Sequence, residues 1–490
     1  MLDHILDKIK PDSDLPARVG VLEIRTRALD GTLYDALPHP FYREESGTGE
    51  YIPLSERRPS VRCGLVKTVV DDSVSLLFSE GHFPSLQCDD ESTKSSLEGI
   101  IKDARIKDAM IDAATRGAIG SVALMVRFLS KRVFISVLPS MHLTPTWKPE
   151  EPDTLAAVTE RRKVAGKQLQ DAGYSIPDED QATQFWFSRL WSDDEETWLT
   201  PVKVTDKDAV AVRDDLRSVQ HGLGFVPIIW IKNLPGGDEI DGAPTFTRDA
   251  LATVIEIDYQ YSQAGRGLRY SSDPTLLIKE PTFSGREMIR SASNAITVDK
   301  DGDAKLLEIN GSAASAVLEY VKALRETAIE SMHGNRSNAD KLSAAQSGRA
   351  LELMHQALIW LSDKLRSSYG EGALLSLLKM IIKGAQRYPI TIDGKAKPLN
   401  PSAQIGLTWP AWFPATADDK NTLALAIQSH RASGTLSVET AVASIASIYD
   451  IENVQAELAK IKADQAEAMS SQIALAQSVP APADHVTNND

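Results

Sequence analysis

Cysteine and long apolar runs are scarce in this sequence of 490 residues. Cys63 and Cys88 are its two cysteines, too few for a disulfide framework, and neither belongs to a CxxC or Cys/His metal-binding pattern. No stretch approaches the ~20 apolar residues that span a bilayer, and the amphipathic start "MLDHILDK" lacks the apolar centre of a signal peptide. We therefore expect a protein of a reducing, intracellular compartment that is neither exported nor embedded in a membrane.

Catalytic and cofactor-binding motifs are missing as well. No GxxxxGK[ST] phosphate loop occurs, the histidines show no HExxH or paired spacing, and the "GLG" at Gly222–Gly224 lacks the third glycine of a dinucleotide site. Cys63 falls in line with the apolar face of a predicted helix, which favours a packed thiol over a nucleophile. We expect no enzyme activity and no cofactor.

Two acidic stretches invite comparison with metal sites. "DKDGD" at Asp299–Asp303 resembles a calcium loop, but its glycine comes early and no glutamate stands at the twelfth place, so a solvated hairpin turn is the better interpretation. "DDEE" at Asp193–Glu196 could hold a divalent cation, but a charge run between two strands is usually a wet turn. We therefore expect no metal site.

Positive charge is in deficit, since 53 Lys and Arg residues stand against 68 Asp and Glu residues, for a net charge of −15. This balance argues against a protein that grips nucleic acid over a broad basic surface, although it allows loose contact with DNA. The hydrophobic fraction of 42% is that of an ordinary globular protein, so a sizeable core is feasible. At ~150 residues per domain, the length suggests three or four packed units.

The N-terminal half predicts a mixed α+β domain. Apolar residues at steps of three and four indicate one helix over about Val61–Phe78 and a second over Ser92–Thr115. β-Branched and aromatic residues around a polar reversal at Ser130 and Lys131 predict a β-hairpin. Further strands are expected at Ala156–Lys163, Thr183–Trp191, Glu196–Val204 and Val226–Ile231.

Helices dominate the C-terminal half. Amphipathic stripes predict helices over Thr247–Tyr270 and Ala313–Met332. Between them we expect a compact insertion, with strands at Thr275–Lys279, Ala295–Val298 and Lys305–Ile309 and a small helix near Ser284–Ser291. A polar loop then leads into a long helix over about Ser343–Gln386, which "YGEG" at Tyr369–Gly372 should bend.

Three helices are expected at the end of the ordered chain. Gly434 is a plausible helix stop, and Ser437 and Asp450 are plausible helix starts. The closing "VPAPADHVTNND" is rich in Pro, Ala and Asn, and we expect this tail to be disordered.

This order of helix, insertion, helix, loop and bent helix resembles the portal, or head-to-tail connector, proteins of tailed double-stranded DNA bacteriophages. The resemblance is carried by "RRPSVRCGLVKTVVDDSVSLLFSEG" for an early helix, "HGLGFVPIIWIKN" for the strand before the stem, "GNRSNADKLSAAQSGRALELM" for the loop and the start of the bent helix, and "TWPAWFPATADDKNTLALAIQSHRASGTLSVETA" for the entry to the crown. It covers nearly the whole chain, but Pro149–Asp215 shows no feature of the family.

The resemblance implies an α+β portal fold with a mixed α/β wing, long stem helices, a small α/β clip and a helical crown. The implied boundaries are a wing over 1–244, stem helices over 245–271 and 312–332, a clip over 272–311, a tunnel loop over 333–345, the kinked helix and wing return over 346–414, a crown over 415–478 and a tail over 479–490.

The function that the resemblance implies is structural. Such a protein forms a homo-oligomeric ring, a dodecamer, at a single capsid vertex of the virion, after synthesis in the host cytoplasm. The ring is the channel for viral genome packaging and DNA ejection, and double-stranded DNA passes through it without a membrane. Its partners would be the terminase large subunit, head-completion or adaptor proteins, and the major capsid and scaffold proteins.

Two sets of residues are expected to meet these partners. The tunnel loop would line the DNA channel with Asn335, Arg336, Ser337, Asn338 and Lys341. Its cations would form a light ring around DNA, or they are merely solvated loop charges. The clip would dock the packaging motor through Lys279, Arg286 and Arg290, unless its strands bind only the clip of the next subunit.

Two other classes of protein remain as alternatives. One is a nucleic-acid-processing or capsid-associated enzyme, which the missing catalytic motifs disfavour. The other is a non-viral scaffold of α-helical bundles. Negative-stain images would separate the three, because a ring with a central hole selects the portal.

Overall fold

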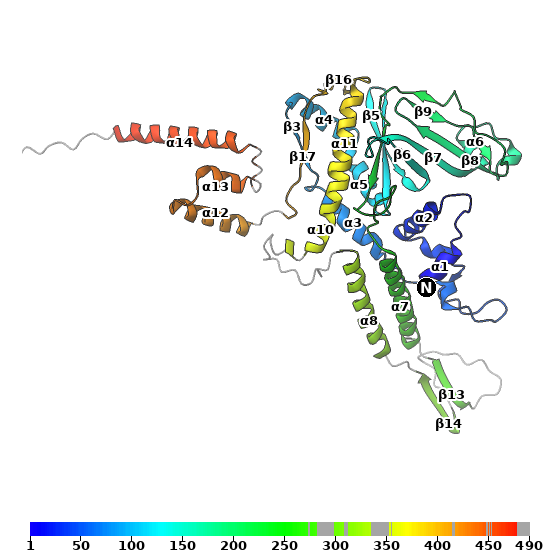
Figure 1. The fold of residues 1–490 in the computed structure, drawn as a ribbon. Helices are drawn as coiled ribbons and strands as arrows, with labels where there is room; N and C mark the ends of the chain where they lie inside the picture. Colours follow the sequence, from blue (N-terminus) through cyan, green and yellow to red (C-terminus); the bar gives the residue numbers. More distant parts are fainter. Residues whose placement is uncertain are drawn as a thin grey trace, which may run out of the picture. The chain divides into compact units, whose positions relative to one another are not determined.

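The computed structural model describes residues 1–272, 275–281, 298–307, 312–334, 352–353, 355–413, 417–446, 449, 451 and 453–477 (Figure 1). The chain divides into two compact units. The first consists of Met1–Arg336 and Ala357–Thr408, and the second of Ser337–Gln356 and Trp409–Asp490. Helices and several small sheets make up the fold, so the predicted α+β class is confirmed.

A three-stranded antiparallel sheet of order β12-β4-β5 lies at the centre of the first unit. Its strands are β4 (Ser121–Leu129), β5 (Arg132–Pro139) and β12 (Ile228–Lys232). The predicted hairpin between β4 and β5 is confirmed, and its two turn residues, Ser130 and Lys131, have φ values of 50° and 61°. Two consecutive left-handed residues are the geometry that a tight two-residue hairpin requires.

A second antiparallel sheet contains six strands in the order β11-β9-β8-β7-β6, with β10 paired to β8. Its strands are β6 (Leu143–Trp147), β7 (Leu155–Ala165), β8 (Gln184–Trp191), β9 (Glu195–Trp198), β10 (Val202–Lys203) and β11 (Val219–Gln220). The strands predicted at Ala156–Lys163 and Thr183–Trp191 are confirmed, whereas the one expected over Glu196–Val204 is divided into β9 and β10. The sheet fills most of the segment in which the sequence showed no family feature.

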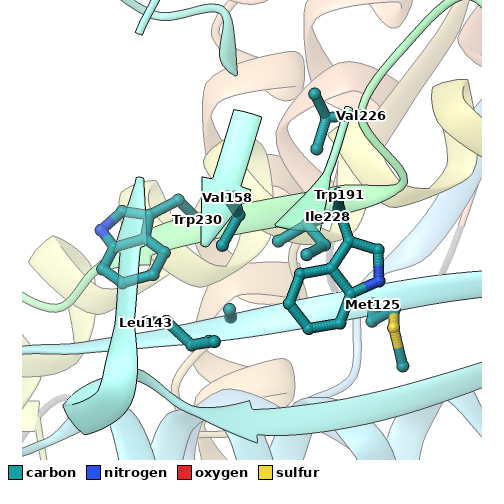
Figure 2. Close-up of a cluster of buried hydrophobic side chains, with 8 residues drawn as sticks. Met125, Leu143, Val158, Trp191, Val226, Ile228 and Trp230 are labelled. Carbon is teal, nitrogen blue, oxygen red and sulfur yellow. The ribbon is translucent and has the colours of Figure 1, made fainter. Parts of the chain in front are cut away.

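The two sheets share one buried hydrophobic cluster (Figure 2). Met125 of β4 and Ile228 and Trp230 of β12 meet Val158 of β7 and Trp191 of β8 there. Met125 and Trp230 are 3% and 9% exposed and Val158 and Trp191 are fully buried, so this cluster is completed within a single chain.

Helices α3 (Leu65–Phe78) and α5 (Ile106–Gly117) pack against each other, and α5 also packs on β4 and β5. The single helix expected over Ser92–Thr115 is instead two, α4 (Glu91–Asp103) and α5, because Arg105 takes a left-handed conformation with φ of 50°. α3 begins four residues later than expected, after Gly64 with φ of 59°. Both helix boundaries are set by left-handed backbone conformations, which the spacing of apolar residues does not predict.

The long bent helix is built of α10 (Gln356–Leu365), a π-helical segment η6 (Arg366–Leu374) and α11 (Leu375–Ala385). The π-helical segment occupies the predicted bend. Its Tyr369 is fully buried and donates a hydrogen bond to Asn233 Oδ1 at 3.0 Å. Gly117 makes room for this ring, since a Cβ there would stand 1.9 Å from the Tyr369 hydroxyl oxygen.

Two long helices, α7 (Arg248–Ser272) and α8 (Ser312–Ser331), lie side by side, and a two-stranded hairpin lies between them in sequence (Figure 1). Both helices were predicted. The hairpin consists of β13 (Thr275–Pro281) and β14 (Val298–Leu307). The turn expected at Asp299–Asp303 and the two separate strands expected around it are wrong, because the single strand β14 runs through this segment. It pairs Asp303 with Lys279 and Val298 with Pro281, with a register irregularity between these two pairs. The small helix expected near Ser284–Ser291 lies outside the described residues.

The second unit contains the three predicted helices, α12 (Ala417–Ala432), α13 (Val438–Ile445) and α14 (Val454–Gln477). Gly434, with φ of 74°, follows α12, and the Ser437 side chain caps α13 by accepting from the Thr440 N–H at 3.1 Å. Asn453 precedes α14 and accepts from the Ala456 N–H at 3.0 Å. Asp450 and the tail lie outside the described residues.

The remaining elements surround the centre of the first unit. They are α1 (Leu2–Lys8), α2 (Ala17–Leu29), α6 (Gly166–Asp171), the paired strands β1 (His39–Pro40) and β2 (Arg57–Arg58), β3 (Ser85–Cys88) and β17 (Ile405–Thr408), and β15 (Thr391–Ile392) and β16 (Lys395–Ala396).

Candidate functional site: the α7–α8 pair

The first half of α7 is rooted in the hydrophobic core. Leu251, Val254 and Ile255 are between 1% and 6% exposed, and they lie on the stripe that the sequence predicted. Tyr259 is buried too, and its hydroxyl donates to the backbone oxygen of Arg57 at 2.8 Å. The root of the helix is therefore held by packing within its own chain.

Asp258 is a buried carboxylate at the centre of this root. Its Oδ2 accepts from the Tyr34 hydroxyl at 2.7 Å, and its Oδ1 accepts from the Cys63 N–H at 2.9 Å and the Cys63 thiol at 2.8 Å. One turn along the helix, the Ser262 hydroxyl accepts from the Val61 N–H at 3.0 Å. These bonds fasten the segments before α3 to α7.

The position of Cys63 corrects the sequence interpretation. The residue precedes α3 instead of lying on the apolar face of that helix, and it is exposed overall. Its thiol nevertheless points at Asp258, and burial together with this carboxylate raises the pKa of the thiol to about 12. Burial and the same carboxylate also raise the pKa of Tyr34. Both groups stay protonated near neutral pH and act as hydrogen-bond donors.

A loop from the N-terminal region wraps the middle of α7. Arg57 is 1% exposed, donates to the Phe41 backbone oxygen at 3.1 Å and to the Tyr51 hydroxyl at 3.1 Å, and lies over both rings. Further along α7, Arg266 pairs with Glu44 at 2.6 Å. The loop therefore follows the helix over more than one turn.

α8 is far less covered than α7. Among its described side chains, which begin at Ser315, Val321 and Ala328 are buried. In contrast, Leu318 and Tyr320 are 47% and 50% exposed, and Leu268 near the end of α7 is 51% exposed. Large apolar side chains therefore stand in solvent on the far part of the pair.

The chain leaves α8 at a tightly packed stop. Met332 is buried, His333 is left-handed with φ of 54°, and the Gly334 N–H donates to the Ile329 backbone oxygen at 2.9 Å. A Cβ on Gly334 would stand 2.8 Å from the Val69 side chain of α3, so the chain passes very close to that helix. A residue with a side chain would not fit there without a shift.

The chain returns to the same helix after the polar segment. On α10, Ser362 is fully buried, and its hydroxyl lies 3.5 Å from the Ser73 backbone oxygen of α3. Val69 and Ser73 are one helical turn apart. The segment between 334 and 362 thus starts and ends against one side of α3.

Most of the predicted site residues cannot be placed. Five tunnel-loop residues (Asn335, Arg336, Ser337, Asn338 and Lys341) and two clip residues (Arg286 and Arg290) lie outside the described residues. Lys279 lies on β13, opposite Asp303. The contacts of Asp258 and the exposed Leu318 and Tyr320 were not predicted, although an Asp on an otherwise apolar stripe was a signal that a buried partner exists.

The acidic "DDEE" stretch is part turn and part strand. Glu195 and Glu196 begin β9, where Glu195 pairs with Arg213 at 3.0 Å and Glu196 pairs with Arg127 at 3.0 Å. The backbone oxygens of the preceding aspartates accept hydrogen bonds from the "HGLG" segment, at 2.9 Å from His221 N. Within the described part of the chain, no group of three His, Cys, Asp or Glu residues is arranged to hold a metal ion.

Among the helices that the structure describes, none combines the length and the hydropathy that a bilayer crossing requires.

Comparison with known proteins gives matches among solved structures, whereas no family model and no curated protein matches. The chain is similar to one in "Neck of native GTA particle computed with C12 symmetry", with 13% identity and a TM-score of 0.39 over 78% of this chain and 90% of that chain. A chain in "Neck of empty GTA particle computed with C6 symmetry" gives 14% identity and a TM-score of 0.40 over 77% and 87%. A chain in "Virion of native gene transfer agent (GTA) particle" gives 13% identity and a TM-score of 0.36 over 77% and 86%.

These neighbours are chains of particle necks and virions. The functional proposal below is argued from the geometry of this chain.

Proposed function

We propose that this chain is the subunit of a portal, a homo-oligomeric ring at one vertex of a phage-like capsid through which double-stranded DNA is packaged and ejected. The observation that supports it best is the α7–α8 pair. Two long helices carry a β-hairpin away from a core that holds only their roots, and apolar side chains remain exposed along them. Among the described residues of a lone subunit, Leu318 and Tyr320 are only about half covered.

Neighbouring copies in a closed ring would supply that cover. Leu318 and Tyr320 are large and each about half exposed. Residues two positions apart on an α-helix are separated by about 200° around its axis, so these side chains lie on opposite flanks of α8. Exposed apolar side chains mark interaction surfaces, and each subunit of a ring uses two different faces, so each flank of α8 would meet a different neighbouring copy.

The proposed domains follow the boundaries expected from the sequence. Residues 1–244 with 346–414 would form the wing, 245–271 and 312–332 the stem, 272–311 the clip and 415–478 the crown. The β13–β14 hairpin between α7 and α8 supports the clip, and the three helices of the second unit support the crown. The ring would belong to the virion, and the free subunit to the cytoplasm of the host.

The tunnel loop, residues 333–345, would hang into the channel. Its start at Gly334 lies against α3, and the chain contacts α3 again at Ser362 of α10. Twelve copies of a chain with a net charge of −15 would sum to about −180, so the channel wall would repel phosphate and leave DNA free to slide. Energy for packaging would come from a separate ATPase, the terminase.

The clip would dock the terminase and, later, the head-completion proteins. Charge reversal at Arg286 and Arg290 should leave rings intact while abolishing motor docking, because a mixed-charge surface suits exchangeable partners. Unchanged docking would remove the clip from this role. If rings are lost as well, the clip instead binds the next subunit.

The ring itself is tested by mass and by image. Light scattering of the purified chain at high concentration should report an oligomer, and negative-stain images should show rings with a central hole. A chain that stays monomeric while its helices are ordered by circular dichroism would overturn the proposal. A filled, irregular particle would favour the helical scaffold instead.

A further inference from the structure

The second unit buries little of its own apolar surface. Its helices α12, α13 and α14 have 16, 8 and 24 residues. Within the described part of this unit, the buried apolar residues are Ala441, Val442 and Leu458, and none of them belongs to α12. Helices in proteins are stabilised mainly by packing of an amphipathic face. These three helices therefore need a surface that one copy of the unit does not supply.

An open groove of about 590 Å³ follows α12. Ile445 at the end of α13 and Tyr449 contribute to its lining. The α12 residues of the lining recur at steps of three and four, so they share one face of the helix: Lys420, Leu423, Ala424, Ile427, Gln428 and Arg431. An apolar groove with this spacing is the kind of surface that takes an amphipathic helix.

The far part of α14, from Lys462 to Ser470, is a helix of matching character. Every side chain in it is exposed, and Met469 is 67% exposed, so it does not occupy the groove of its own chain. Leu458 is buried near the start of α14, and Met469 follows it by about three turns. Met469 therefore continues the stripe on which the start of the helix packs. At ~1.5 Å per residue, the far part and the α12 lining are each about 12–17 Å long.

The charges of the two surfaces are complementary. Lys420 and Arg431 stand at the two ends of the α12 lining. The far part of α14 carries Asp464 and Glu467 against Lys462, so it is acidic overall. Both carboxylates lie away from the Met469 stripe, and they would stay in solvent beside the cationic ends of the groove. Complementary potentials of this kind steer two surfaces together.

We propose that the groove binds the far part of α14 from a neighbouring copy of this chain. The groove and the helix are different surfaces of one subunit, so each copy gives a helix to one neighbour and receives a helix from the other. Such a head-to-tail contact closes a ring. The inference rests on the proposed ring, and it gives the second unit a contact between subunits that is separate from α8.

Crosslinking between two variants tests the exchange. Full-length chains with Ile427→Cys and with Met469→Cys, each with its own tag, are co-expressed and treated with a short bismaleimide. Each copy has one new cysteine, so a crosslink that joins the two new cysteines forms only between copies, and the parent chain gives the background of Cys63 and Cys88. The matched control replaces Ile427→Cys by Ser429→Cys, which is exposed on the opposite face of α12. Denaturing gels should show at least fivefold more doubly tagged dimer with Ile427→Cys than with Ser429→Cys.

Light scattering of the same samples separates this inference from the proposed function. Rings without excess crosslinking would overturn the exchange and leave the ring standing. Excess crosslinking without rings would support the exchange and contradict the ring. Loss of both would overturn both.

A second pair of variants tests the apolar lining. Leu423→Asp places a carboxylate in the groove, and in the Ile427→Cys chain it should lower the crosslink yield at least fivefold. Leu425→Asp is the control, because Leu425 is 66% exposed and lies outside the lining. Circular dichroism checks that both variants keep their helices. Equal yields from the two folded variants would show that the groove does not hold α14.

Discussion

The two-sheet body and the α7–α8 pair differ in how much of their surface one chain can bury. In the body, strands from both sheets close a cluster in which Val158 and Trp191 are fully buried. On α8, Leu318 and Tyr320 remain about half exposed, although the helix is long and regular. This difference indicates that the two-sheet body buries its apolar surface within one chain. The α7–α8 pair, in contrast, leaves apolar side chains exposed for contact with another molecule.

α7 contains both behaviours within one helix. Its root holds Asp258, which serves three donors, and its far end holds Leu268, which is 51% exposed. Substitutions at the root should therefore change folding stability, and substitutions on the exposed surface should change assembly. Predictions that separate these two outcomes test the comparison directly.

The largest effect is expected on assembly. Leu318→Asp combined with Tyr320→Asp should abolish rings, because two carboxylates would be buried at the proposed contact between copies. The monomer should keep its fold, since exposed substitutions usually cost within ~0.5 kcal/mol. Light scattering and circular dichroism measure the two outcomes. Glu319→Ala with Glu326→Ala, exposed on the same helix, is the control that should still form rings, and rings that survive the Asp pair would contradict the comparison.

The next effect is expected on stability. Asp258→Ala removes the acceptor of Tyr34 and Cys63 and should lower the free energy of unfolding by about 3 kcal/mol. Asp249→Ala, exposed on the first turn of the same helix, should cost no more than about 0.5 kcal/mol. Urea denaturation measures both. Equal losses would mean that the root of α7 is not held by this carboxylate.

A similar loss of stability is expected at Gly117, where the first unit leaves no space for a side chain. Gly117→Ala places a methyl group 1.9 Å from the Tyr369 hydroxyl oxygen and should cost about 1–3 kcal/mol by overpacking. Tyr369→Phe removes that oxygen, so the double variant should be less destabilised than the sum of the two single variants. If the losses in unfolding free energy of the two single variants simply add up in the double variant, the crowding at η6 is relieved in another way.

Cys63 gives a chemical test of the root. A pKa raised to about 12 leaves almost no thiolate at pH 8, so alkylation of Cys63 should be at least tenfold slower than that of a free thiol, despite its exposure. Because the folded-state pKa is above the ordinary thiol pKa of 9.0, this group stabilises the fold below about pH 9 and loses that contribution as pH rises toward 12. Rapid labelling at pH 8 would show that the thiol does not meet Asp258.

Sequence patterns predicted the elements of both regions well, because apolar period and turn chemistry are local. The Ser130 and Lys131 turn, the Ser437 cap and the two long helices all follow from neighbouring residues. The failures have different causes. The helix boundaries at Gly64 and Arg105 are set by left-handed backbone conformations. Asp299–Asp303 has turn-like composition but belongs to β14, which pairs with β13 across a register irregularity.

The candidate site was less predictable than the fold. Asp258 was visible as a polar residue on an apolar stripe, but its partners Tyr34 and Cys63 are about 200 residues away in sequence. The same holds for Gly117 and Tyr369, whose contact no local pattern records. The exposure of Leu318 and Tyr320 depends on how elements that are distant in sequence pack around α8, and local sequence patterns do not predict such packing.

The smallest effect on folding is expected in the tunnel loop. Arg336→Ala and Lys341→Ala should leave stability within ~0.5 kcal/mol of the parent and leave rings intact, as exposed loop substitutions usually do. They should instead change how much DNA is packaged or retained, because each ring would lose a level of cations facing DNA. Deletion of Asn335–Leu342 should be harsher on packaging, while Gly334 and Ser362 of α10 keep their separate contacts with α3. The measurement is the length of DNA per particle in capsids assembled with each ring. Full-length DNA with the deleted loop would show that this segment does not act on DNA, and the exposed surface of α8 would then remain the part of the pair with a function in assembly.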